Sequence, residues 1–332
     1  MTSAKCILNL VDIVKRVEVE ITSDVYEANL VTHDATFHAD EVFASVIAAL
    51  YLNCSKGLNV VKICRTSYIP KDLNKDVIVY DVGGGKFDHH SVKDSVYKVR
   101  KNGIPYAAAG LIWRAFGNEL IQNTPDDKAV WFQVERKLIR GIDAVDNGTL
   151  PCIDYPTSAM SISNVISNFN PVWDDDITSY DEAFLEALSF AGKIFDKIFN
   201  RAISKVRAKV LVEENIERTD GEIMIMECFL PWVKHLLFSE NPKAEKIKFV
   251  IHKSQREGFE WHTVPKGNTR ELRNIPRVAV PEEWRGMREK NLQKVTGIPT
   301  AIFCHLSGMT GSAETLNDTI DMVKLAIASE KT

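Results

Sequence analysis

The stretch EANLVTHDATFHADEVFASVIAALYL, residues 27–52, predicts a strand, a polar loop and a helix in direct succession. Residues 27–31 form a short β-rich run, and residues 40–52 follow a helical apolar pattern. Further segments repeat this alternation: strands at 60–63 and 77–80, and helices at 107–116 and 127–144, the last beginning near Pro125 and Asp126. Such alternation predicts a parallel sheet covered on both faces, which binds its ligands beyond the carboxyl ends of the strands.

The second half of the chain predicts a long helix and then a smaller α/β domain. Residues 168–176 resemble a loop, and 180–214 has a helical pattern that we interpret as a connector. The later segments alternate again: strands at 222–229, 247–252, 259–264 and 300–305, and helices near 285–295 and 313–328. Because 332 residues with 45% hydrophobic content fit about two domains, we expect the layout 1–178, 179–215 and 216–332.

The composition of the chain excludes few classes of function. A net charge of −4 gives no global attraction to nucleic acid, so a polyanionic substrate must be held by a local patch or by metal ions. The six scattered cysteines include no C-x-x-C pair, which argues against a zinc knuckle or a disulfide framework. Without a membrane-length apolar run or a secretory signal, we expect a cytoplasmic protein; the acids within and after residues 7–17 disfavour an organelle presequence.

The loop between the first strand and the first helix carries side chains that ligate metals. His33 and His38 lie in this loop, and Asp40 and Glu41 lie in the first turn of the helix. Imidazole and carboxylate groups are ligands for divalent ions such as Mn²⁺. Helix capping would explain Asp40, but it would not explain both histidines. Taken alone, this loop favours a metal site and a structural role about equally.

A carboxylate and three glycines follow the strand at 77–80. Asp81 comes directly after this strand, where a carboxylate can lie at the floor of a cleft and bridge two ions. Gly83 and Gly84 allow backbone or substrate to approach closely. An Asx turn is the alternative explanation for Asp81.

The segment Asp88-His89-His90 is the sharpest of the four motifs. Adjacent histidines project differently, so one can ligate a metal while the next contacts substrate. Asp88 can orient an imidazole through a hydrogen bond. A lone His-His pair more often lies on the surface without a function. This motif therefore indicates a metal site only in combination with the other motifs.

The fourth motif places Asp143 and Asp146 near the end of a helix. Acids spaced by three share one helix face, and at a C-terminus they oppose the helix dipole. A bound cation explains such a placement better than helix stability does, although Asp-Asn-Gly is also an ordinary turn. His and Asp thus recur at successive element ends, which independent caps and turns would not be expected to produce.

These ordered motifs resemble the DHH phosphoesterase superfamily. The matching segments are His33…His38-Ala39-Asp40-Glu41, Asp81-Val82-Gly83-Gly84, Asp88-His89-His90 and Asp143-Ala144-Val145-Asp146-Asn147-Gly148. The first of them, with Trp284-Arg285-Gly286 and His305-Leu306-Ser307-Gly308, resembles more closely the melanocyte-proliferating-gene (Myg-type) exonuclease branch. The resemblance spans nearly the whole chain. It implies a doubly wound N-terminal catalytic domain, a smaller C-terminal substrate-binding domain and phosphoester hydrolysis; the eukaryotic member of this branch is described as a 3′-5′ RNA exonuclease.

Carried over residue by residue, the resemblance implies a site for two divalent cations, with manganese expected and magnesium as the alternative. His33 and His38 would hold one ion, Asp40 and His89 the other, and Asp81 would bridge them. Asp143 and Asp146 both remain candidates for the fourth-motif ligand. Many members of the superfamily carry an aspartate where this chain has His38, so its metal preference could differ from theirs.

The expected catalytic and substrate-binding residues come from both halves of the chain. His90 would face the scissile phosphate, with Asp88 and Arg285 as its catalytic partners. Arginines and glycine-bearing turns before helices bind phosphate, although a helix face and a connecting loop are the structural alternative here. The expected substrate-binding set is Gly83, Gly84, Arg285, Arg288, His305, Ser307, Gly308 and Gly311.

Three functions fit these motifs. An exonuclease acting on RNA or short oligonucleotides needs a groove for several nucleotides, whereas a small-molecule phosphatase or pyrophosphatase needs only a closed cleft with a few cations. A non-catalytic metal-binding protein is disfavoured because His90, Arg285 and His305 are all present. The sequence leaves open the choice between the first two, the polarity and length preference of digestion, the native metal and the oligomeric state.

Overall fold

The computed structural model describes residues 5–10, 15–90, 99–122, 124, 126–149, 160–175 and 179–330. Pro125 and Asp176, which belonged to a predicted helix start and a predicted loop, lie outside the described residues. The chain divides into two compact units, Met1–Ser204 and Lys205–Thr332. None of the helices in the described part of the chain is both long enough and apolar enough to cross a membrane.

The first unit is built on a five-stranded, mostly parallel sheet. Its strand order is β1-β2-β4-β3-β5, in which β1 and β2 are antiparallel and the other neighbours are parallel. The strands are β1 (Lys5–Leu10), β2 (Lys15–Ile21), β3 (Leu30–Thr32), β4 (Val60–Arg65) and β5 (Ile78–Val79). This arrangement and the mixed content of the second unit confirm the predicted α/β class.

The sequence did not predict strands β1 and β2. Val17 and Val19 are fully buried, whereas their neighbours Glu18 and Glu20 are partly exposed. This period of two is typical of a strand with one buried face. The N-terminal segment therefore extends the sheet.

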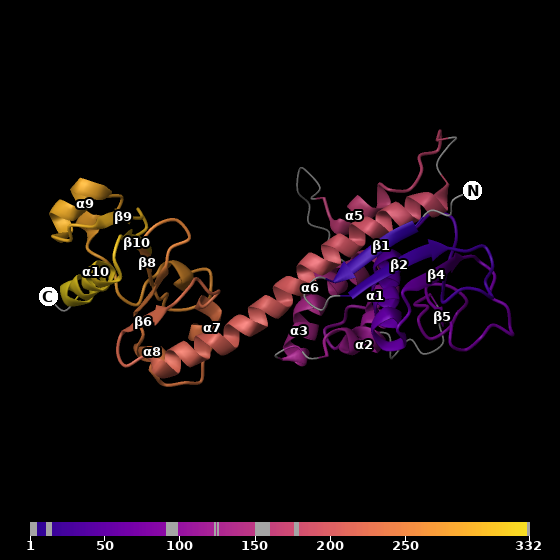
Figure 1. Cartoon of the computed structure of the whole chain (residues 1–332), viewed down its shortest axis with the longest axis horizontal. Helices are drawn as coiled ribbons and strands as arrows, with labels where there is room; N and C mark the ends of the chain where they lie inside the picture. The colour runs from indigo at the N-terminus through magenta and orange to yellow at the C-terminus, as the bar shows by residue number, and fades with distance from the viewer. Residues whose placement is uncertain are drawn as a thin grey trace. The chain divides into compact units, whose positions relative to one another are not determined.

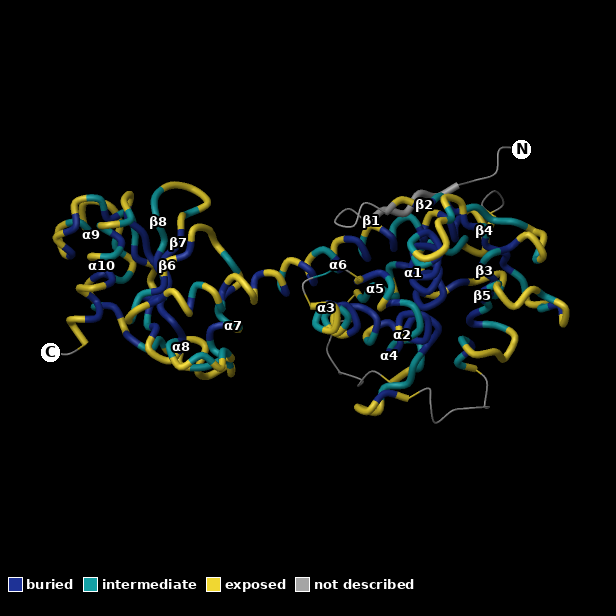
Figure 2. Tube along the Cα trace, turned by 60° about the horizontal axis from the view of Figure 1, so that its bottom comes forward, coloured by how far each residue is buried: buried dark blue, intermediate teal, exposed yellow. Residues whose placement is uncertain are grey.

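Helix α1 (Ala39–Lys56) is the central helix of the first unit. It is buried along most of its length, as Figure 2 shows, and it packs against α2 (Ala108–Leu120) and the sheet. The backbone N–H of His38 donates to Oε1 of Glu41, 2.6 Å away, at the start of the helix. Gly57, with a φ of 70°, ends it in the left-handed conformation that glycine adopts without strain. Both ends of α1 are therefore fixed locally, which positions its first turn.

The helix predicted at 127–144 is continuous but not uniform. It comprises α3 (Asp127–Val134), a π-helical segment (Glu135–Ile139) and α4 (Arg140–Asp146). Asp126 caps its start by accepting a hydrogen bond from the N–H of Ala129. Figure 1 shows α3 beside the long α6 (Tyr180–Arg218), and α4 contacts α5 (Ile162–Ser167).

The predicted connector at 179–215 corresponds to α6. Its first part packs into the first unit, where Phe184 contacts Phe37 and Phe195 contacts Trp113. Its last part contributes Val212 and Ile216 to the core of the second unit. The division between the units falls within this helix, after Ser204. The three-part layout stays a prediction.

The second unit contains a second five-stranded sheet, of order β6-β7-β8-β10-β9. Hydrophobic clusters cover it: one includes Trp261 and Met322, the other Met224 and Trp232. Its strands are β6 (Ile223–Met226), β7 (Phe249–Lys253), β8 (Phe259–Thr263), β9 (Ala301–Cys304) and β10 (Thr310–Ala313). Its α-helices are α7 (Val233–Leu237), α8 (Lys243–Lys246), α9 (Glu289–Thr296) and α10 (Leu316–Ser329), with short 3-10 turns at Leu272–Asn274 and Glu282–Trp284.

The segment 305–311 departs from its predicted structure. We expected a glycine-bearing turn before a helix near 313–328, but strand β10 lies between them and α10 begins only at Leu316. Gly311 belongs to that strand and is buried, and a Cβ atom there would lie 2.5 Å from the ring of Trp261. Close packing against the Trp261 ring and the Phe303 carbonyl oxygen therefore accounts for this glycine. The helix begins after β10, and phosphate binding by the turn stays a prediction.

Candidate metal centre

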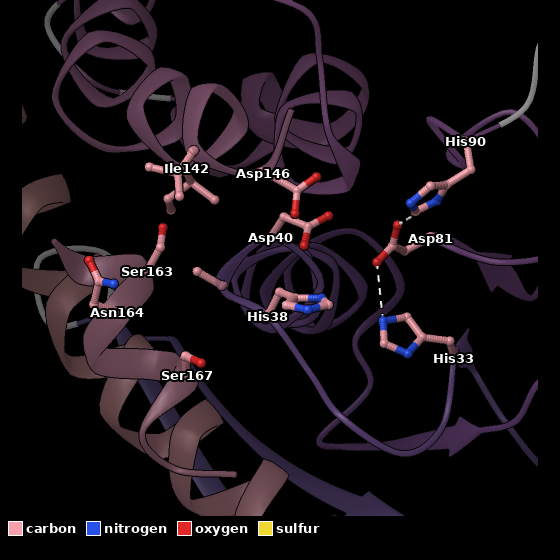
Figure 3. A pocket seen from close by; sticks show the side chains of 12 residues that line it. His33, His38, Asp40, Asp81, His90, Ile142, Asp146, Ser163, Asn164 and Ser167 are labelled. Carbon is pink, nitrogen blue, oxygen red and sulfur yellow. Dashed lines mark ion pairs between the residues drawn. The ribbon is translucent and has the colours of Figure 1, made fainter. Parts of the chain in front are cut away.

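Several predicted ligands line one cavity in the first unit. The cavity has a volume of about 610 Å³. Figure 3 shows imidazole and carboxylate side chains gathered on one side of it and polar side chains of α5 on the other. Its lining residues are His33, His38, Ala39, Asp40, Asp81, His90, Ile142, Val145, Asp146, Ser163, Asn164 and Ser167.

The loop after β3 directs His33 towards two carboxylates. Its Nε2 lies 3.1 Å from Oε1 of Glu41 and 3.3 Å from Oδ2 of Asp81. Its Nδ1 faces the carbonyl oxygen of Asp34 at 2.9 Å, so this nitrogen carries the proton and Nε2 presents the lone pair of the neutral ring. Ala35 has a φ of 59°, which a non-glycine residue rarely adopts. The loop is thus held in a strained conformation beside the candidate site.

Asp81 also has a left-handed backbone, with a φ of 57°. Its side chain is 2% exposed and lies at the carboxyl end of β5, as the parallel sheet predicts. Oδ2 approaches His33, and Oδ1 lies 3.2 Å from Nδ1 of His89 and 3.5 Å from Nδ1 of His90. One carboxylate therefore stands between histidines from two motifs.

His89 and His90 occupy different environments, as adjacent residues of the third motif were expected to do. The His89 side chain is 9% exposed, and its Nε2 lies 2.9 Å from Oδ2 of Asp146. The His90 side chain is 68% exposed. Its Nδ1 lies 3.2 Å from Oδ1 of Asp88, which also accepts a hydrogen bond from the His90 backbone N–H. Asp88 therefore orients His90 at the edge of the cavity.

The two acids of the fourth motif lie in different environments. Asp146 lines the cavity and contacts His89. Asp143 is fully buried, accepts a hydrogen bond from the N–H of Gly110 and forms a 2.5 Å ion pair with Arg100. Arg100 also donates through Nε to Glu135 of the π-helical segment. Asp143 therefore belongs to a buried Arg100–Glu135–Asp143 network behind the site, and its oxygens are already satisfied.

Asp40 caps another helix rather than its own. Its Oδ2 accepts a hydrogen bond from the N–H of Ala108, the first residue of α2. Its Oδ1 has no hydrogen-bond partner in the described protein. An oxygen of Asp40 lies within 4.8 Å of donor atoms of His38 and Asp146, and within 4.8 Å of donor atoms of Glu41 and Asp81. Capping thus accounts for one oxygen of Asp40 and leaves the other directed at the cluster.

The ionisation of the cluster reflects its excess of carboxylates. Burial, followed by Glu41, Asp81 and Asp146, raises the pKa of Asp40 well above its usual value. Burial opposes protonation of His33, but Asp81 and Glu41 outweigh it and raise the pKa of His33 to about 10. Burial likewise opposes protonation of His89, whereas Asp146 and Asp81 raise its pKa to about 9. Burial also disfavours the charged form of Asp81, but His33 and His89 lower its pKa to about 2. In the metal-free protein, protons thus supply the positive charge that the carboxylates require.

The residues fit divalent cations. Within the described part of the chain, three buried carboxylate oxygens have no hydrogen-bond partner: Oδ1 of Asp40, Oε2 of Glu41 and Oδ1 of Asp81. Nδ1 of His89 is also buried there without a hydrogen bond, although it faces Oδ1 of Asp81 at 3.2 Å. Unsatisfied buried polar atoms are rare in folded proteins, and mixed carboxylate and imidazole donors suit ions such as Mn²⁺. The site can therefore offer a metal buried donor atoms that form no hydrogen bond within the described protein.

Some groups at this site were not predicted from the sequence. Glu41 belongs to the first motif but was not predicted as a ligand, although it lies in the first turn of α1 beside Asp40. Ser163, Asn164 and Ser167 carry no recognisable motif, and only the packing of α5 places them at the cavity. The partner of Asp143, Arg100, also lies too far away in sequence for a local pattern to reveal.

The remaining predicted residues lie in two places. Gly83 and Gly84 follow Asp81 with φ values of 79° and 69°, and the N–H of Gly84 donates to Asp88. Within the second unit, the turn at 305–308 brings His305 Nδ1 within 2.8 Å of Ser307 Oγ. The other predicted groups there surround this turn or its strand: Arg285, Arg288, Gly308 and Gly311.

Comparison with known proteins identifies the family. A family model named MYG1_exonuc, described as an uncharacterised protein family (UPF0160), matches residues 29–327. The chain belongs to this family. The MYG1 protein of Schizosaccharomyces pombe is 31% identical over 322 residues, covering 90% of this chain and 97% of that protein. The MYG1 protein of Saccharomyces cerevisiae is 30% identical over 329 residues, covering 90% and 95%.

Mammalian relatives match the same share of this chain. The MYG1 exonuclease of Mus musculus is 29% identical over 327 residues, covering 90% of this chain and 84% of that protein. No solved structure matches the chain. Membership of the MYG1_exonuc family confirms the Myg-type branch predicted from the motifs, while placement in the wider DHH superfamily stays a prediction.

Proposed function

We propose that this protein is a metal-dependent phosphoester hydrolase of the DHH type that removes nucleotides from RNA or short oligonucleotides in the 3′-5′ direction. The observation that carries the proposal is the convergence on one cavity of carboxylates and imidazoles from four separate motifs, including the buried Oδ1 atoms of Asp40 and Asp81, which have no hydrogen-bond partner in the described protein. Relatives that align over about 90% of the chain carry the name MYG1 exonuclease, which supports a nuclease.

The proposed ligands for two divalent cations are the cluster residues with available donor atoms. We include Asp146 and omit Asp143, because Arg100 and Gly110 already bind the latter. When bound, manganese or magnesium ions would activate a water molecule for attack on phosphorus and neutralise charge on the phosphate. The proposed ligand set is His33, His38, Asp40, Asp81, His89 and Asp146, with Glu41 as a further donor.

His90 is the proposed catalytic residue outside the ligand set. Its exposed imidazole lies at the cavity, where it can donate a hydrogen bond or a proton to the phosphoryl group. Asp88 restrains the ring through Nδ1, which leaves Nε2 directed to substrate. We also retain Arg285, Arg288 and the turn at 305–308 as proposed substrate contacts.

One observation favours a smaller substrate as the second candidate. Among the described residues that line the cavity, none is Lys, Arg, Phe, Tyr or Trp. A groove for several nucleotides generally combines basic side chains with aromatic platforms for the bases. The cavity itself therefore suits one terminal nucleotide, or a small phosphate ester or pyrophosphate, better than a length of strand.

A direct assay separates these candidates. Protein reconstituted with Mn²⁺ or Mg²⁺ is incubated with pyrophosphate, with dinucleotides, and with RNA and DNA oligomers labelled at either end. We expect mononucleotides to be released from the 3′ end of RNA, so that a 5′ label is retained on progressively shorter products. Release from the 5′ end would contradict the polarity, and hydrolysis of pyrophosphate alone would establish the second candidate.

A further inference from the structure

Two neighbouring strands of the second unit bring histidines and a glutamate to one face of the sheet. In the antiparallel pair of β7 and β8, His252 lies opposite Glu260 and Val250 lies opposite His262. Residues two apart on a strand share a face, and so do directly opposed residues. His252, Glu260 and His262 thus form a cluster on the face opposite that of Ile251 and Trp261.

The hydrogen bonds of His252 determine which of its nitrogens can bind a cation. Nδ1 lies 2.9 Å from the carbonyl oxygen of Lys253, which can only accept, so Nδ1 carries the proton. The neutral ring therefore presents its lone pair at Nε2. That atom lies 3.0 Å from Nε2 of His262. A backbone carbonyl that fixes the tautomer of a histidine in this way is typical of metal-bound imidazoles.

Glu260 supplies a third donor with its own orienting contact. Its Oε1 accepts a hydrogen bond from the hydroxyl of Ser254 at 2.7 Å, and its Oε2 lies 3.7 Å from Nε2 of His262. The ligand atoms of the three residues all lie within 4.8 Å of one another. His252 is buried, whereas His262 and Glu260 are about a quarter exposed. The cluster therefore opens to solvent on one side.

We propose that His252, His262 and Glu260 form a separate site for a zinc-class divalent cation. Tetrahedral zinc with Zn–N distances of about 2.0 to 2.1 Å places two imidazole nitrogens about 3.3 Å apart, close to the 3.0 Å between these Nε2 atoms. Opening the pair by a few tenths of an ångström would admit the ion. Two imidazoles and one carboxylate leave a fourth position for water or another ligand.

The chemistry of this site differs from that of the first unit. The first cluster is rich in carboxylates, whereas this one has two imidazoles, and nitrogen donors favour Zn²⁺ or Co²⁺ over Mn²⁺ and Mg²⁺. Aromatic rings of Phe229 and Trp232 lie against the imidazoles, with centroid separations of 5.2 and 6.3 Å.

The test measures zinc bound to the full chain by equilibrium dialysis and elemental analysis. His262→Gln is compared with the parent protein, and His235→Gln, which alters a histidine of the same unit outside the cluster, is the matched control. Zinc can also bind to the cluster of the first unit. The same variants are therefore measured again in protein that also carries Asp81→Asn. We expect His262→Gln to lose about one Zn²⁺ per chain in both backgrounds, and His235→Gln to lose none.

A second variant keeps the test decisive if His262→Gln does not fold, as judged by circular dichroism. Ser254→Ala removes only the hydroxyl that orients Glu260, so we expect it to fold and to bind this zinc about 10-fold or more weakly. An ordinary hydrogen bond between the two histidines would give a different result. In that case His262→Gln would retain the parent zinc content, or Ser254→Ala the parent affinity, and either outcome would overturn the proposal.

Discussion

Nε2 of His89 lies 2.9 Å from Oδ2 of Asp146, and this contact joins the loop after β5 to the end of α4. The other ring nitrogen of His89 faces Asp81. A buried imidazole thus stands between two carboxylates that come from separate motifs. Removing one of these groups, or changing its charge, should therefore alter the ionisation and the metal affinity of the whole cluster.

Asp81→Asn should abolish phosphoester hydrolysis and most metal binding while preserving the fold. Asparagine tolerates the left-handed backbone at this position, but it lacks the charge needed to hold cations near His33 and His89. Activity and bound manganese are measured together, with circular dichroism to check folding. Asp76→Ala, at an exposed acid just before β5, is the control and should behave like the parent. A fully active Asp81→Asn protein would remove the proposed bridging role.

His89→Ala and His90→Ala should separate metal binding from catalysis. His89 is buried between Asp81 and Asp146, so its loss should reduce both metal content and turnover. His90 is mostly exposed, so its loss should leave metal content unchanged and lower turnover by about 10² to 10⁴-fold, the usual contribution of general-acid help. Metal analysis and single-turnover kinetics compare the two variants. Indistinguishable variants would contradict this division of labour.

The sequence predicted the elements that carry the site because their signals are local. The strand before His33 and the helix after Asp40 follow from apolar patterning within a few residues, and α1 begins one residue before its predicted start. By contrast, β10 contains Gly311 and no aromatic residue, so it gives no strand signal. Its close contacts with the Trp261 ring on β8 and the Phe303 carbonyl oxygen on β9 explain that glycine.

The choice between Asp143 and Asp146 needed the tertiary structure for a similar reason. Both acids lie on one helix and have the same local chemistry. They differ because Arg100, more than 40 residues earlier in the chain, neutralises Asp143, whereas the loop after β5 brings His89 to Asp146. A sequence pattern can identify acids of the correct type, but it cannot show which of them already has a partner.

The thermal stability of the metal-free protein should fall as the pH rises from 7 to 10. The pKa values of His33 and His89, raised to about 10 and about 9 by their carboxylate partners, exceed the usual value near 6.5. A group with a raised pKa in the folded state stabilises it fully below its unfolded pKa and loses that effect as the pH passes its folded pKa.

The metal-bound protein should behave in the opposite way. Cations compete with protons for these imidazoles. The affinity of the protein for the cations, and the stability that bound cations add, should therefore grow with pH over the same range. Melting temperatures with Mn²⁺ and with a chelator should therefore diverge between pH 7 and 9. In Asp81→Asn, which lacks the carboxylate shared by both histidines, the metal-free protein should show a shallower pH dependence. Parallel curves for the metal-bound and metal-free parent would contradict this account.

Asp143→Ala should mainly lower the stability of the protein, whereas Asp146→Ala should mainly lower its affinity for metal. Asp143→Ala leaves the buried guanidinium of Arg100 with one of its two carboxylate partners, Glu135, and breaking a buried pair in this way typically costs about 3 to 5 kcal/mol. Asp146→Ala removes a partly exposed carboxylate at the cavity, so metal affinity should fall sharply with a smaller loss of stability. Urea unfolding of the metal-free proteins and manganese titration of the folded ones measure the two effects. If Asp143→Ala weakened metal binding more than Asp146→Ala did in folded protein, the assignment of Asp146 as the ligand would be wrong.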